Sequence, residues 1–154
     1  MDNGLANQTF DTNRKVNLLL SRYGESHQHP TNEKIHFVCV PVIMWTVLAL
    51  AWSLHPVLAL SLTGLALIYY ASLSIGFAIG MSMMAAVMIG ILHSMPQDLI
   101  LTVAVVAFVI AWIFQFIGHK IEGKKPSFFE DLQFLLIGPL FVIGFLYRRW
   151  KLPY

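Results

Sequence analysis

The sequence carries very little charge over most of its length. Charged residues make up 12% of the 154 residues, and between Phe37 and Gly118 the only formally charged side chain is Asp98. A soluble domain with so long an uncharged run would expose an apolar surface, so the soluble class is excluded. The net charge of +2 is too small to indicate a nucleic-acid partner, and no basic–aromatic groove is visible.

Cysteine is almost absent, and a secretory signal is missing. The single cysteine, Cys39, cannot form a disulfide within the chain, so cysteine usage does not reveal the redox compartment. The N-terminal segment is polar and has no apolar h-region, so we expect no cleaved signal peptide.

Apolar residues are abundant instead, at 57% of the chain. A membrane-spanning helix needs roughly 20 apolar residues, so the uncharged run holds about four of them. We expect one all-α, polytopic membrane domain with helices at 30–54 and 57–70, a third that follows a break at 71–74 and ends near residue 92, and a fourth at 99–118. Ser72, Gly76 and Gly80 recur at four-residue spacing, which indicates close helix packing.

The segments on either side of these helices have different patterns. Residues 1–10 are expected to be disordered, and 11–24 form an amphipathic helix that lies either in the headgroup plane or against the bundle. Residues 119–127 form a polar loop. The apolar segment 128–147 is interrupted by Gly138-Pro139, and we interpret it as a re-entrant hairpin or interfacial helical pair rather than a fifth crossing.

Basic residues predict the orientation in the membrane. They occur in the N-terminal segment, in the 119–127 loop and at the C-terminus, and they are absent from the turns at 55–56 and 93–98. Because cytoplasmic segments are enriched in Lys and Arg, both termini are predicted to be cytoplasmic. The membrane would be the inner membrane in a bacterium or the endoplasmic reticulum in a eukaryote.

The histidines suggest where the chemistry occurs. His27, His29 and His36 precede or begin the first expected helix, and His119 follows the fourth, so four crossings bring all of them to one membrane face. Imidazole suits iron, zinc, copper and nickel, so a metal site is one interpretation and hydrogen-bonded interface residues are the other. His55 and His93 belong to the opposite face, where we expect structural roles.

Neighbouring polar residues are consistent with a site. Asn32 lies four residues before His36, and Gln115 four before His119, so each side-chain amide is predicted to orient an imidazole from the second shell. Glu122 shares a face with His119 if the helix continues, which makes it a candidate metal ligand; a salt bridge to a nearby lysine is the alternative. Lys124 and Lys125 are candidates for binding a substrate carboxylate, or they anchor the chain at the headgroups.

These residues resemble the Fe(II)-dependent 2-hydroxy fatty acid dioxygenase family of small polytopic membrane proteins. The matching pieces are His27-x-x-Pro30-x-Asn32-x-x-x-His36 followed by Pro41, and WIFQFIGH, residues 112–119, with Glu122 and Pro126. The resemblance implies that His27, His36 and His119 hold Fe(II), whereas His29 varies within the family pattern. It also implies α-oxidation, in which O2 and a long-chain 2-hydroxy fatty acid give the acid one carbon shorter.

A different class of function uses the same histidines. A non-enzymatic membrane protein could bind haem or lipid through them, and a purely structural membrane protein is a third possibility. The partners expected on the enzyme interpretation are the 2-hydroxy fatty acid, O2 and membrane lipid.

Overall fold

The computed structural model describes residues 15–25, 27–123, 134–152 and 154, and these residues form helices and no strand. The predicted residues 1–10, the start of the amphipathic helix, Lys124, Lys125 and residues 126–133 lie outside the described part. The helices are α1 (Lys15–Gly24), α2 (Pro30–Leu54), α3 (Pro56–Leu73), α4 (Ile75–Ser94), α5 (Gln97–Glu122), the 3₁₀ turn η2 (Phe134–Leu136) and α7 (Ile137–Arg149).

The four long helices are those expected from the sequence. α2, α3, α4 and α5 are each long and apolar enough to cross a membrane. Their outward surface is apolar as well: Leu65 and Ile68 on α3 are 64% and 68% exposed. An apolar surface of this extent requires lipid rather than water around it, so the polytopic all-α fold is confirmed.

Short polar caps set the helix boundaries. Pro30 and Pro56 each occupy the first turn of a helix, where a missing N–H does no harm. The side chains of His29 and His55 accept hydrogen bonds from the backbone N–H groups of Thr31 and Val57. Serine at position 74 caps α4 in the same way. His55 is therefore a helix cap, in agreement with its expected structural role.

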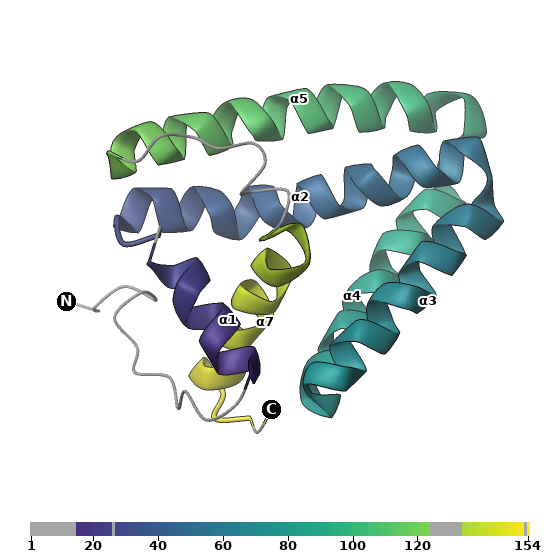
Figure 1. Cartoon of the computed structure of the whole chain (residues 1–154). Helices are drawn as coiled ribbons and strands as arrows, with labels where there is room; N and C mark the ends of the chain where they lie inside the picture. Colours follow the sequence, from purple (N-terminus) through teal and green to yellow (C-terminus); the bar gives the residue numbers. More distant parts are fainter. Residues whose placement is uncertain (1–14, 26, 124–133, 153) are drawn as a thin grey trace.

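Two pairs of antiparallel helices form the body of the molecule (Figure 1). α2 and α5 pack along their length, with the start of α2 beside the end of α5, and the α3–α4 pair is inclined to them. α5 continues to Glu122, beyond the predicted end at residue 118, and ends at Gly123, whose φ of 74° is in the left-handed region that glycine tolerates. His119 consequently lies within a helix and not in a loop.

α7 packs against α2 and α4, and α1 packs against α7 (Figure 1). Val16 and Leu20 of α1 are fully buried in a cluster with residues of α7, so α1 is a packed helix, the second of the two arrangements considered for it. α4 also contacts α7: a Cβ at Gly80 would overlap the Tyr147 hydroxyl. Gly80 thus serves close packing, as predicted. Ser72, expected on the same helix, lies instead on α3, which continues to Leu73, and its side chain is exposed.

The C-terminal segment differs from the expected hairpin. Gly138 and Pro139 lie in the first turn of α7, which then continues without a break to Arg149. A proline in the first turn removes no helical hydrogen bond, because the first four N–H groups have no partner within the helix. Gly138 allows close approach to α2, since a Cβ there would lie 2.9 Å from Val40 Cγ1. With 13 residues, α7 is too short to span a bilayer.

Candidate metal centre

Three histidines from three segments converge at the beginning of α2. His27 lies between α1 and α2, His36 on the second turn of α2, and His119 near the end of α5. Each offers one ring nitrogen, and these nitrogens lie within 4.8 Å of one another. The ring centroids are 4.2 Å apart for His27–His36, 4.9 Å for His36–His119 and 5.7 Å for His27–His119. All three side chains are at most 4% exposed.

Backbone carbonyls fix two of these imidazoles. Nδ1 of His27 lies 2.7 Å from the Tyr23 carbonyl oxygen, and Nδ1 of His36 lies 3.0 Å from that of Asn32. A carbonyl only accepts, so Nδ1 donates in both rings and the lone pair is on Nε2. His36 Nε2 is buried without a hydrogen-bond partner among the described residues. This is the usual arrangement of a metal-ligating histidine.

Asn32 acts differently from the prediction. Its backbone carbonyl, and not its side-chain amide, holds His36, while Nδ2 donates to Glu122 Oε2 over 3.0 Å. Its Oδ1 packs on α5, where a Cβ at Gly118 would overlap it. Both possible contacts lie one helical turn before His36, so spacing alone could not distinguish them.

Glu122 ties the two ends of the site together. Its Oε1 accepts a hydrogen bond from the backbone N–H of Gln28 (2.9 Å), and its Oε2 accepts from that of His29 (2.8 Å). Together with the Asn32 bond, the carboxylate joins the end of α5 to the segment that carries His27. Glu122 is not part of the three-histidine group. Its described contacts instead hold the end of α5 against residues 28–32, and we call this set of hydrogen bonds the Glu122 clamp.

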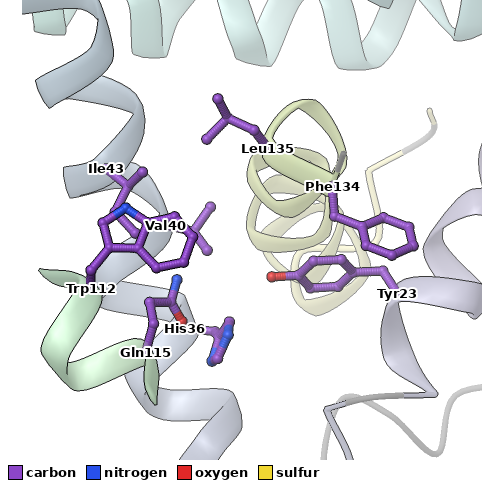
Figure 2. Close-up of a pocket in the computed structure, with 8 residues that line it drawn as sticks. All are labelled: Tyr23, His36, Val40, Ile43, Trp112, Gln115, Phe134 and Leu135. Carbon is purple, nitrogen blue, oxygen red and sulfur yellow. The ribbon is translucent and has the colours of Figure 1, made fainter. Parts of the chain in front are cut away.

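Gln115 and His36 line a small pocket of ≈ 20 Å³ (Figure 2). Gln115 Oε1 is buried without a hydrogen-bond partner in the described part of the chain, so the predicted contact with His119 is not made through this atom. Figure 2 shows His36 and Gln115 at one end of the pocket and Leu135 at the other. The Tyr23 hydroxyl points into the space between them.

The other sequence candidates lie outside the cluster. His29 is exposed and caps α2, and His55 and His93 are exposed at the far ends of their helices. Sequence reasoning missed Tyr23, whose ring stacks on His27 at 4.1 Å and whose carbonyl holds it. The signal was available, because Tyr23 precedes His27 by four residues, the same spacing as Asn32 and His36.

The residues present fit a transition-metal ion. They supply three imidazoles, two with Nδ1 engaged by a carbonyl, in a site shielded from water. Such donors suit iron, zinc, copper or nickel, and three protein ligands leave positions for other ligands. They do not fit haem, because imidazole rings packed at 4.2–5.7 Å leave no room for a macrocycle.

Fold and site together define a polytopic helical membrane protein with a buried three-histidine centre. The chain belongs to the family described as 2-hydroxy-palmitic acid dioxygenase Mpo1-like, whose model matches residues 14–150. It is similar to the 2-hydroxy-palmitic acid dioxygenase MPO1 of Saccharomyces cerevisiae, with 26% identity over 141 residues that cover 87% of this chain and 81% of the yeast protein. No solved structure matches the chain. The family expected from the two-part motif is confirmed.

Proposed function

We propose that this protein is an Fe(II)-dependent dioxygenase that converts a long-chain 2-hydroxy fatty acid to the acid one carbon shorter. The observation that carries the proposal is the convergence of His27, His36 and His119, buried between apolar helices. The name of the yeast relative supports the substrate class. Bound Fe(II) would supply the one-electron chemistry with O2 that amino-acid side chains lack.

The overall reaction balances without a further reductant. R–CH(OH)–COOH and O2 give R–COOH, CO2 and H2O. The bond between C1 and C2 breaks, C2 becomes the new carboxyl carbon, and C1 leaves as CO2. The substrate carbons lose four electrons and O2 accepts four, so the hydroxy acid itself is the reductant.

The chain's own residues would bind and orient the substrate. Gln115 Oε1, beside His36, is an acceptor with no hydrogen-bond partner among the described residues, and a 2-hydroxyl group is a donor of matching size. The apolar rings of Trp112 and Phe134 line the same pocket and exclude water from it. The assignment of Lys124 and Lys125 to the substrate carboxylate stays a prediction.

Five histidine variants test this function. His27→Ala, His36→Ala and His119→Ala should each lose bound iron and turnover together, measured by metal analysis of anaerobically purified protein and by product analysis. His55→Ala and His93→Ala are matched controls, because they remove exposed imidazoles far from the cluster, and both should keep iron and activity. Equal loss in all five would indicate a folding defect, and full turnover in iron-free protein would refute the mechanism.

The substrate itself provides a second check. An unsubstituted fatty acid lacks the 2-hydroxyl donor that Gln115 is proposed to bind, so it should be a poor substrate. Comparable turnover of the two acids would contradict this assignment.

A further inference from the structure

A second, larger cavity adjoins the pocket at the histidines. Its volume is ≈ 120 Å³, and residues of α2, α3, α4 and η2 line it. Leu135 of η2 lines both cavities. Two neighbouring residues of α2 line one cavity each: Ile43 lines the smaller pocket, and Met44 lines the larger cavity. Leu135 therefore lies between the two spaces, at the end of the smaller pocket away from His36 (Figure 2).

The wall of the larger cavity is almost entirely apolar. Among the residues that line it, only Thr63 and Tyr70 have polar side chains. The Thr63 hydroxyl donates to the Ala59 carbonyl over 2.8 Å, and the Tyr70 hydroxyl donates to the Leu136 carbonyl over 3.0 Å. Both hydroxyl protons are thus already used within the protein. A buried water needs about two to four polar partners, so hydrocarbon suits this space better than water.

The two volumes suit the two ends of an amphiphile. A water-sized group needs roughly 10–15 Å³ of cavity volume. The smaller pocket therefore has room for about one such group, and the larger cavity for on the order of ten. The small pocket carries Gln115 Oε1, which no described residue hydrogen-bonds, whereas the large pocket is apolar. An amphiphile spanning both spaces would place its polar head on one side of Leu135 and its tail on the other.

We infer that the larger cavity holds the acyl tail of the substrate and that Leu135 forms the passage between tail and head. The inference rests on the proposed function and assigns chain-length selection to α3 and α4, far in sequence from the histidines. Each methylene moved from water into an apolar site raises affinity by about fourfold. The depth of the cavity would then set the preferred chain length.

A matched pair of substitutions on α4 tests this. Ala85 lines the cavity and is 9% exposed, whereas its neighbour Ala86 is exposed on the outer surface. A phenylalanine ring at position 85 displaces about three methylenes, so Ala85→Phe should lower kcat/KM for 2-hydroxypalmitic acid by about 60-fold. Turnover of 2-hydroxydecanoic acid should change only a few-fold, and iron content should not change. Ala86→Phe should keep the original chain-length profile.

A binding measurement on the unsubstituted protein covers the case in which Ala85→Phe does not fold. A 2-hydroxy fatty acid with a diazirine at its terminal carbon should crosslink to cavity residues such as Met44 and Met81, which peptide mass spectrometry can locate. Excess 2-hydroxypalmitic acid should compete for the labelling.

Failure of this inference is distinct from failure of the proposed function. Crosslinks only on outward-facing residues, or identical chain-length profiles for Ala85→Phe and Ala86→Phe, would overturn the tail assignment while turnover persists. Labelling of the cavity by a diazirine phospholipid, without competition by the hydroxy acid, would mean that a bilayer lipid fills it and would also overturn the assignment. No turnover of any 2-hydroxy acid by iron-loaded, unsubstituted protein would refute the function itself.

Discussion

Gln115 is a buried polar residue whose acceptor atom, Oε1, has no partner in the described part of the chain. Burying an unsatisfied polar group costs about 1–3 kcal/mol, and replacement by an apolar group of similar shape can be neutral or stabilising. The residue is 3% exposed, so solvent does not satisfy it. The proposed contact with the 2-hydroxyl group of the substrate would satisfy this acceptor.

The substitution Gln115→Leu separates a structural role from a substrate-binding role. We expect the melting temperature in detergent to stay equal or rise, because the unsatisfied acceptor is removed, while turnover falls by about 10–100-fold, the range typical of residues around a metal site. Thermal unfolding and product formation, measured on the same preparation, give both quantities. A lower melting temperature with normal turnover would show that Gln115 supports the fold instead.

The sequence predicted that His27, His36 and His119 converge, and the structure brings these three side chains together, but the sequence did not show how they are held. Counting crossings brought His27, His36 and His119 to one face, because an even number of spans returns the chain to its starting side. The four-residue spacing also predicted a partner one turn before His36 and one turn before His119, namely Asn32 and Gln115. It could not tell a side-chain amide from a backbone carbonyl at Asn32, since both lie at the same height on the helix.

At the level of helices, Glu122 connects elements that are more than ninety residues apart in the sequence. In the described part of the chain, its two oxygens accept hydrogen bonds from N–H groups of Gln28, His29 and Asn32. Hydrogen bonds of charged groups contribute more than neutral ones, about 1.5–3 kcal/mol each, although solvent reduces the value at a partly exposed residue such as this one. The clamp should therefore hold His27 in position relative to His119.

Glu122→Gln should damage the site nearly as much as Glu122→Ala. Whichever way the amide is turned, its NH2 group replaces one acceptor and faces an N–H donor. We expect iron retention to fall by about tenfold or more, measured by competition with a chelator. Asp98→Asn is the matched control, because it makes the same chemical change at the exposed first turn of the same helix, and it should retain iron normally. Equal losses in the two variants would rule out a clamp specific to Glu122.

The sequence was least informative where distant elements meet. Gly138-Pro139 suits both a broken hairpin and the first turn of a helix, and only the packing of α7 against Val40 decides between them. Leu135 had no detectable signal, because its place between two cavities depends on where η2 lies relative to α2, α3 and α4. The sequence named Glu122 as a candidate ligand beside His119. It did not show that residues 28–32 lie next to the end of α5, and these residues supply the hydrogen-bond partners of Glu122.

For the molecule as a whole, four apolar helices and a site at one end imply a defined direction in the bilayer. α5 leads from the turn at Met95-Pro96 to Gly123, and it is 26 residues long. At 1.5 Å per residue this exceeds the hydrocarbon thickness of about 30 Å. The histidine centre should therefore lie near one membrane surface and the α4–α5 turn near the other.

The distribution of basic residues predicts that the histidine centre is on the cytoplasmic side. Cysteines at Ser94 and at Lys120, both exposed positions at opposite ends of α5, can test this in a Cys39→Ser background that removes the single native thiol. With the protein in a bacterial inner membrane, an impermeant maleimide added to intact cells or sealed right-side-out vesicles should label Ser94→Cys at once, and Lys120→Cys only after permeabilisation. The reverse pattern would keep the fold but invert the orientation. Labelling of both from one side would mean that α5 does not cross the membrane, which would contradict the four-span arrangement.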